Sequence, residues 1–407
     1  MIRQYEEEGG IANPLPVQAV TIRRNRPVRL LYTIIGLILF YLLIAYEPVP
    51  LPILAHSPKK IQYDLHPTYE YFSLYRQKAD IAFEAALDEK LRALEQEIIK
   101  ALPTDHHALT TNLTIWQITT QEAADALPLW TDQWRDNNQE WFYNLYTSPP
   151  AEQYSHFKDI PEIAGMNSTS TTVQNDLLRY LLLWFHGGFS ADVDTWDRVA
   201  LRDCLPIAAV LANEKEVSLM VGVDLDEPFL SDATMREWKW PRAVGFGQAA
   251  IWAPMRFDPI LRKAIVRTVS HAMIYNTFAE ETWREKITAR TDYTGEISGN
   301  GMLTDVVLEV LSATLKEGHK MRDREAGLER RVSWKKFRGL KEFLWIGREQ
   351  VKEGSEHDMR GLAVLPINVW GSGKSHSKSG TFDHPDACIN HMPGFRPKES
   401  LKQKVFG

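Results

Sequence analysis

The chain has 407 residues, of which 44% are hydrophobic and 25% are charged, a composition typical of a globular protein with a sizeable core. Its formal net charge of -6 offers no broad basic field for nucleic acid, so we expect no nucleic-acid partner. Cys204 and Cys388 form no Cys-x-x-Cys pair, which argues against a structural zinc site. They can form one disulfide or remain two buried thiols.

An uncharged apolar run, residues 30–46, predicts one membrane anchor near the N-terminus. A cleaved signal peptide is the alternative, but the run starts late and Glu47 and prolines stand where a small-x-small cleavage site is needed. Four arginines precede the run, at positions 23, 24, 26 and 29. This basic bias predicts a cytosolic tail, residues 1–29, and a lumenal remainder. In that topology Asn112-Leu-Thr and Asn167-Ser-Thr are glycosylation acceptors.

A stem is expected at residues 47–108, because five prolines lie between positions 47 and 70. A helix predicted at residues 74–102 follows them, with leucine and isoleucine at steps of four and three. It can pair with another chain in a homo- or hetero-oligomer, or pack on the globular domain that we place at residues 109–407.

Strand-like and helix-like segments alternate in this domain. The strand candidates are residues 113–119, 141–147, 217–225, 244–252 and 362–370. The helix candidates include residues 173–186, 259–275 and 302–316. The alternation predicts an α/β fold with a largely parallel sheet. A segment rich in Gly, Ser and Lys, residues 371–383, is expected to be a disordered tail or a lid that orders on substrate.

The most informative segment, residues 175–196, combines an apolar helix, a reversal and a strand. Asp176 and Arg179 are three residues apart and project from one face near the start of the helix. Gly187-Gly188 is expected to end the helix and turn the chain back.

The return strand is expected to deliver two more charged residues, Asp192 and Asp194. The helix covers roughly 15 Å on the way out, and the strand covers roughly 13 Å on the way back. Asp192 and Asp194 should therefore lie beside Asp176 and Arg179, at the carboxyl end of a strand, where open α/β sheets bind ligands.

Asp-x-Asp in a strand points both carboxylates to the same side, which suits a divalent cation. Such a cation can neutralise the diphosphate that leaves a sugar nucleotide. Asp176 and Arg179 can hold sugar hydroxyls. A lone Asp-x-Asp is most often a solvated surface pair, but the preceding Asp-x-x-Arg, apolar helix and Gly-Gly make this one more specific.

The segment DLLRYLLLWFHGGFSADVDTW, residues 176–196, resembles the signature of glycosyltransferase family 32. Its Ser-Ala-Asp-Val-Asp-Thr end is most similar to the fungal initiating α-1,6-mannosyltransferases of the Golgi. The likeness covers residues 109–402, through Ile115-Trp-Gln, GQAAIWAP and GNGMLTD. It implies a GT-A-type nucleotide-sugar-binding domain with a Rossmann-like sheet, retention of anomeric configuration, GDP-mannose as donor, manganese or another divalent cation, and an N-glycan acceptor.

The resemblance also implies roles for three further residues. Trp116 is expected to stack on the nucleotide base, with a core tryptophan as the equal alternative. His391 is expected to add a metal ligand to Asp192 and Asp194. Asp305 either caps the helix near residue 302 or contacts the acceptor.

Three functions are compatible with these features. The first is a retaining mannosyltransferase of the Golgi membrane, a single-pass type II protein with its catalytic domain in the lumen. The second transfers mannose to an inositol-phosphorylceramide lipid, although those relatives usually have additional membrane spans. The third is a catalytically silent scaffold subunit of a Golgi mannosyltransferase complex, which would have lost the charged cluster. Since all four residues of that cluster are present, the sequence favours the first.

Overall fold

The computed structural model describes residues 35–36, 79–102, 111–147, 151–227, 242, 244–281, 294–316, 318–321, 335–353 and 359–392. The chain divides into two compact units, residues 1–59 and 60–407, and only Ile35 and Gly36 are described in the first. The predicted tail, most of the predicted anchor at residues 30–46, and residues 47–78 therefore lie outside the described residues. Within the described ranges, no helix combines the length and the apolar character needed to cross a membrane.

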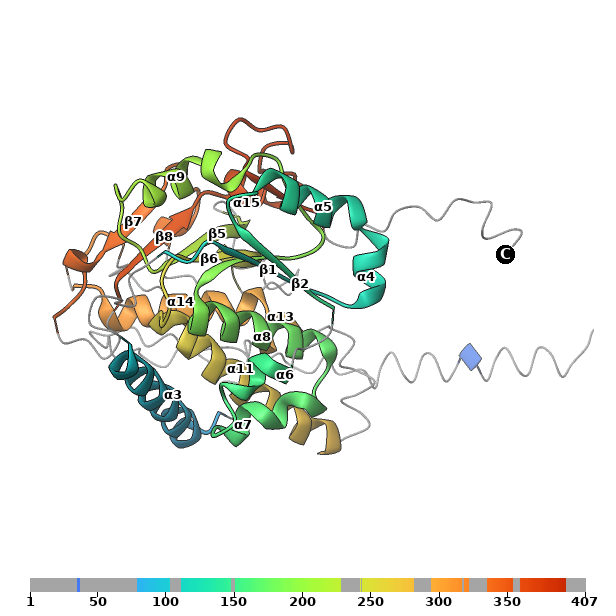
Figure 1. Ribbon diagram of the computed structural model, residues 1–407, viewed down its shortest axis with the longest axis vertical. Coiled ribbons are helices and arrows are strands. Elements are labelled where there is room, and N and C mark those ends of the chain that lie inside the picture. Colours follow the sequence, from blue (N-terminus) through green and yellow to red (C-terminus); the bar gives the residue numbers. More distant parts are fainter. Residues whose placement is uncertain are drawn as a thin grey trace, which may run out of the picture. The chain divides into compact units, whose positions relative to one another are not determined.

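A seven-stranded sheet forms the centre of the second unit, in the order β2-β1-β3-β6-β5-β8-β7 (Figure 1). The strands are β1 (Thr114–Ile118), β2 (Phe142–Tyr146), β3 (Gly188–Ala191), β5 (Leu219–Asp226), β6 (Val244–Ala253), β7 (Leu344–Gly347) and β8 (Gly361–Leu365). Strands β6 and β7 run antiparallel to the other five. The expected α/β fold with a largely parallel sheet is confirmed.

Helices cover both faces of this sheet (Figure 1). One face carries α8 (Thr171–His186), α11 (Pro259–Glu281) and α14 (Asn300–Thr314), with α3 (Ile81–Ala101) packed outside α11. The other carries α5 (Pro128–Asn137), α9 (Leu205–Leu211) and α15 (Ile367–Trp370). Shorter helices are α4 (Gln121–Ala126), α6 (Ala151–Ser155), α7 (Pro161–Ala164) and α13 (Thr294–Ile297). The sheet is thus buried on both sides, which explains why β1 and β8 consist wholly of buried residues.

Aromatic rings fill the layer between the sheet and the α5 side. Trp134, Trp141 and Trp370 all contact Phe189 of β3, with ring centroids 5.5 to 6.4 Å apart. Trp252 of β6 packs against Trp141. These tryptophans therefore belong to the core and are not available to stack on a carbohydrate.

A disulfide joins Cys204, just before α9, to Cys388, just before β9 (Ile389–His391). Strand β9 pairs antiparallel with β4 (Thr195–Asp197) in a separate two-stranded sheet. The disulfide was one of two states that the sequence left open. Its position fixes the C-terminal segment beside the chain that follows Asp194.

The predicted helix at residues 74–102 corresponds to α3, which Asp80 caps by accepting a hydrogen bond from the Phe83 amide. Leu87 and Leu91 are fully buried against the domain. Arg262 of α11 donates to Asp88 and to Glu95, each at 2.9 Å. Of the two alternatives for this helix, the structure has the one in which it packs on the domain.

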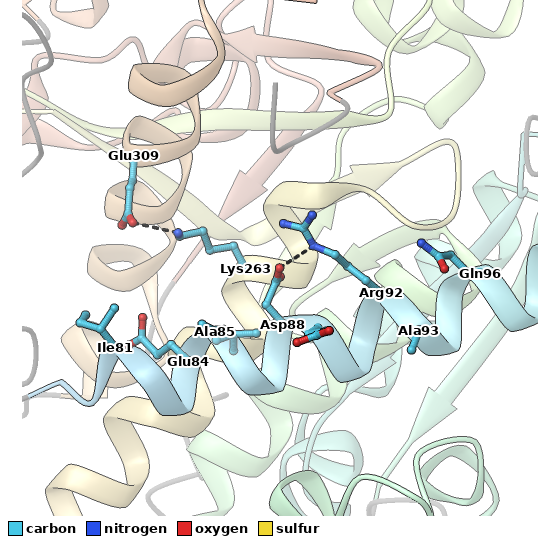
Figure 2. A pocket seen from close by; sticks show the side chains of 11 residues that line it. Ile81, Glu84, Ala85, Asp88, Arg92, Ala93, Gln96, Lys263 and Glu309 are labelled. Carbon is cyan, nitrogen blue, oxygen red and sulfur yellow. Dashed lines mark hydrogen bonds and ion pairs between the residues drawn. The ribbon is translucent and has the colours of Figure 1, made fainter. Parts of the chain in front are cut away.

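A cavity of about 620 Å³ lies beside α3, lined on the far side by Lys263 of α11 and Glu309 of α14 (Figure 2). Lys263 pairs with Glu309 at 2.9 Å, and Arg92 donates to Asp88 at 2.7 Å. None of the predicted site residues lines this cavity.

Two segments near the C-terminus differ from expectation. The strand candidate at residues 362–370 is wrong in its second half, because Pro366 ends β8 and Ile367–Trp370 form the helix α15. The segment at residues 371–383 is an ordered loop and not a disordered tail. Its backbone closes through Gly373 N to Gly380 O at 2.7 Å, and the Ser377 hydroxyl accepts from the Asp226 amide at 2.9 Å.

Candidate active site

Helix α8 ends in the glycine pair that the sequence predicts. Gly187 and Gly188 have φ angles of 77° and 103°, in the region that favours glycine. A Cβ atom at Gly188 would lie 2.6 Å from both the Thr114 carbonyl oxygen and Nε1 of Trp116. The reversal therefore needs glycine for its backbone angles and for its close approach to β1.

Trp116 lies beneath this reversal and is only 7% exposed. Its indole N–H donates to the Gly187 carbonyl oxygen at 2.8 Å, and its ring is nearly parallel to that of Tyr146, at 6.2 Å. These are the contacts of a core tryptophan, one of the two predicted alternatives. A role in base stacking stays a prediction.

Strand β3 runs back along β1 and brings Asp192 to the start of α8, as predicted. The Asp192 amide donates to the Ala249 carbonyl oxygen at 2.8 Å, which fixes its position beside β6. Arg179 donates through Nη2 to the Asp192 carboxylate and through Nε to Ser190 Oγ at 3.2 Å. Its Nη1 lies 3.6 Å from Asp176 Oδ1. Asp176, Arg179 and Asp192 thus meet.

Asp176 and Arg179 are almost fully buried, which limits what they can touch. Asp176 accepts hydrogen bonds from Ser298 Oγ at 2.7 Å and Gln248 Nε2 at 3.0 Å. Arg179, which Asp176 faces, therefore orients the Asp192 carboxylate from inside the domain. Direct contact with a sugar, which the sequence predicted for both, stays a prediction.

His391 reaches the cluster through strand pairing, because β9 places it opposite Thr195 of β4. Its Nε2 lies 3.5 Å from Asp194 Oδ1, and the Met392 amide donates to the Asp194 carbonyl oxygen at 3.0 Å. Asp192, Asp194 and His391 each offer one ligand atom, and these atoms lie within 4.8 Å of one another. The structure brings together the three predicted metal ligands.

This group fits a divalent cation. Carboxylate oxygens and a neutral imidazole nitrogen are both common ligands of divalent cations in proteins. The Nδ1 atom of His391 is buried and makes no hydrogen bond to any described residue. This nitrogen is therefore not engaged by another side chain in the described part of the chain, and the imidazole keeps a lone pair or proton that a bound ion and its ligands can use.

The charges of the cluster also favour an added cation. Burial raises the pKa of Asp192, although Arg179 and His391 act in the opposite direction. Burial likewise raises the pKa of Asp176 to about 6, against the opposing effect of Arg179. Burial alone would lower the pKa of His391, but its hydrogen bond with Asp194 and the charge of Asp192 raise it. A divalent cation beside these carboxylates would stabilise their charged forms against the effect of burial.

Asp305 does not have the first of its two predicted roles, that of a helix cap. It lies in the second turn of α14, which starts at Asn300, so it does not cap the helix. Its side chain is fully buried, and both oxygens accept from Arg242, which also donates to Glu296. Asp305 therefore belongs to a buried ion-pair network, and its contact with the acceptor stays a prediction.

A second polar chain, which the sequence analysis missed, extends from the cluster. The Gln248 amide donates to Asn300 Oδ1 at 2.8 Å, and Asn300 Nδ2 donates to Asp224 Oδ2 at 2.9 Å. Lys374 pairs with Asp224 from the ordered loop. Gln248 and Asn300 lie in the GQAAIWAP and GNGMLTD motifs, so the family resemblance already included both residues. For Lys374, the sequence offered only the Gly-, Ser- and Lys-rich composition of its loop.

The site is that of an α/β protein with a candidate cation centre at the end of a parallel strand. No protein-family model matches the chain. Two curated proteins are similar to it in sequence. HOC1 of Saccharomyces cerevisiae, whose curated name assigns it provisionally to the glycosyltransferases, is 24% identical over 261 residues, or 61% of this chain and 58% of that protein. The initiation-specific alpha-1,6-mannosyltransferase of Candida albicans is 24% identical over 272 residues, or 64% of this chain and 63% of that protein.

These relatives confirm the resemblance to fungal initiating mannosyltransferases that the motifs indicated. The chain spans about three fifths of the length of each of them. Among solved structures, the PaToxG glycosyltransferase aligns over 57% of this chain and 81% of its own, with 14% identity and a TM-score of 0.31. A score that low supports no conclusion about a shared fold.

Proposed function

We propose that the protein is a metal-dependent retaining glycosyltransferase, with a GT-A-type domain that transfers mannose from GDP-mannose to an N-glycan. The observation that carries the proposal is the group of Asp192, Asp194 and His391, which Arg179 supports from within the domain. The similarity to a glycosyltransferase and a mannosyltransferase supports the reaction class and the sugar. An assembled cluster of this kind argues against the scaffold alternative.

The residues of the site divide into ligands and supports. Asp192, Asp194 and His391 would hold the cation, which when bound neutralises the negative charge that develops on the leaving diphosphate. Arg179 fixes the orientation of Asp192, and Asp176 balances the charge of Arg179. Because these supports are buried and hydrogen-bonded, the ligands need little reorganisation before reaction.

Retention of configuration requires the acceptor hydroxyl to attack from the face that the diphosphate leaves. We propose an oxocarbenium-like transition state for this step. The side chains of Asp192 and Asp194 are about a quarter exposed, which leaves room for a donor on their solvent side. Mannosylation of an inositol-phosphorylceramide lipid would use the same site with a different acceptor.

The location of the enzyme is part of the proposal. The apolar run at residues 30–46 and its arginine flank support a type II protein of the Golgi membrane with a lumenal catalytic domain. The Cys204–Cys388 disulfide is consistent with an oxidising compartment. Protease added to intact microsomes should then trim only the tail, and digestion of the catalytic domain without detergent would refute this orientation.

A donor screen tests the proposed reaction. The full chain, purified in detergent, is incubated with Mn²⁺ and a panel of sugar nucleotides, and release of nucleoside diphosphate is measured. GDP-mannose should be turned over fastest, and a chelator should stop the reaction. Turnover of another donor would correct the sugar, whereas no turnover of any donor with N-glycan or lipid acceptors present would refute the proposed activity.

A further inference from the structure

Lys374 and Asp224 form an ion pair next to the proposed metal ligands. Asp224 lies near the end of β5, where its side chain packs over Gly247 of the neighbouring strand. A Cβ atom at Gly247 would lie 3.0 Å from Cβ of Asp224, so the absence of a side chain there makes room for the carboxylate. Lys374 reaches this carboxylate from the loop that follows α15.

The pair is linked to the cluster through strand β6. The Asp192 amide donates to the Ala249 carbonyl oxygen, and the amide of the neighbouring Gln248 donates to Asn300, which in turn donates to Asp224. The side chains of Lys374 and Asp224 are 13% and 17% exposed, so each keeps part of its surface open to solvent. The pair is therefore close to where a cation-bound phosphate group would lie.

The backbone on each side of the pair is held firmly. The Lys374 amide donates to Ser379 Oγ at 2.7 Å, while Gly373 closes the loop through Gly380. Asn300 holds the second oxygen of Asp224 at 2.9 Å. The lysine ammonium group is carried on a flexible four-carbon stem, so it can change partner while the loop stays in place.

We propose that Lys374 is a donor-binding residue that leaves Asp224 to pair with the diphosphate of the sugar nucleotide. This inference rests on the proposed function and adds a residue to it. A diphosphate carries more negative charge than one carboxylate, and lysine is a common point-charge ligand for phosphate. The Asp224 pairing keeps the ammonium group oriented, and it competes with the donor for that group.

This competition predicts opposite effects for the two members of the pair. Lys374→Met removes the phosphate ligand, so GDP should bind about 10- to 100-fold more weakly. Asp224→Asn removes the competitor, so GDP should bind as tightly as to the parent or a few-fold more tightly. Adding Asp224→Asn to Lys374→Met should change nothing further, because the group for which Asp224 competes is gone.

Isothermal titration of the full chain with GDP and with GMP, in saturating Mn²⁺, measures these effects. The preference for GDP over GMP should shrink in Lys374→Met and persist in Lys374→Arg, which keeps the charge. Lys378→Met is the matched control, since it removes a charge from an exposed position of the same loop. Free Mn²⁺, followed by electron paramagnetic resonance without nucleotide, should show equal metal affinity in all these variants.

Each outcome bears on a different claim. If the parent binds no GDP with Mn²⁺ present, the proposed function is wrong and the role of Lys374 is wrong with it. If the parent binds GDP and Lys374→Met binds it equally well, only the role of Lys374 is wrong. If Asp224→Asn weakens GDP binding as much as Lys374→Met does, the exchange of partners is refuted. Asp224→Asn leaves Lys374 in place, so it still tests the exchange if Lys374→Met does not fold.

Discussion

Arg179 of α8 and Asp192, thirteen positions further along the chain, form a partly buried ion pair that closes the helix–reversal–strand unit. The same guanidinium group donates to Ser190 and faces Asp176. One side chain thereby links the start of the helix to the end of the return strand. The position of the proposed metal ligand Asp192 depends on this link.

The variant Arg179→Lys tests the link. Lysine keeps the charge but lacks the planar fork that serves Ser190, Asp192 and Asp176 together. We expect transfer to fall by about 100-fold, as for a misplaced catalytic group, with a smaller loss of Mn²⁺ affinity, because Asp194 and His391 do not contact Arg179 directly. Steady-state rates and Mn²⁺ titration measure the two effects. Arg135→Lys is the control, because Arg135 also pairs with two aspartates but on the surface. Equal activity of both variants would show that the fork has no positioning role.

Trp116→Phe separates the two interpretations of that tryptophan. Phenylalanine retains an aromatic ring beside Tyr146 but loses the hydrogen bond to the Gly187 carbonyl oxygen. We expect the free energy of unfolding to fall by about 1–3 kcal/mol, since a buried carbonyl is left unpaired, and GDP affinity to stay within a few-fold. Denaturant unfolding and nucleotide titration measure these quantities. Unchanged stability with a large loss of GDP affinity would favour base stacking instead.

Leu91→Ala tests whether α3 belongs to the domain. Leu91 is fully buried beneath α3, so truncation should lower the free energy of unfolding by about 2–5 kcal/mol. Ile99, on the same helix, is 38% exposed, and Ile99→Ala should change stability far less. Chemical denaturation of both variants gives the comparison. If the two substitutions cost the same small amount, α3 is an independent stem helix.

Asp197 makes stability depend on pH. Its side chain is fully buried, its Oδ2 accepts a hydrogen bond from Asn138 at 2.9 Å, and burial raises its pKa to about 7. Because the folded-state pKa exceeds the unfolded one, the protonated folded form is favoured at low pH. The stability that this pKa difference contributes is fully present below about pH 4 and is lost as pH rises through about 7.

The variant Asp197→Asn should remove this dependence. Between pH 5 and 8 the parent should lose about 1–3 kcal/mol more stability than the variant, as measured by denaturant unfolding at each pH. The exposed Asp203→Asn should behave like the parent. Parallel pH profiles of the parent and Asp197→Asn would show that the carboxyl is ionised across this range.

The sequence predicted those parts of the site that are close together in the chain. Helix length, the Gly-Gly pair and strand length together determine that Asp192 returns to Asp176 and Arg179, since each step has a fixed rise. The same local patterns located β1, β2, β5 and β6 within one or two residues.

Contacts between distant segments could not be predicted in this way. The pairing of β9 with β4 brings His391 to Asp194, and only the family resemblance indicated it. The partner of Asp305 is Arg242, 63 residues away, and no local pattern reveals that pair. Lys374 and Asp224 are 150 residues apart and meet only because the sheet places β5 beside β8.

The central claim is that Asp192, Asp194 and His391 hold the cation on which sugar transfer depends. The most direct test is Mn²⁺ titration and transfer from GDP-mannose in the parent and in the Asp192→Asn, Asp194→Asn double variant, with and without chelator. Asparagine has nearly the same volume as aspartate, so the fold should persist while the charged ligands are lost. We expect the double variant to lose high-affinity Mn²⁺ binding and to transfer orders of magnitude more slowly, and chelator to abolish transfer by the parent until Mn²⁺ is restored. Near-parent transfer by the double variant in the presence of chelator would contradict the assignment of this site.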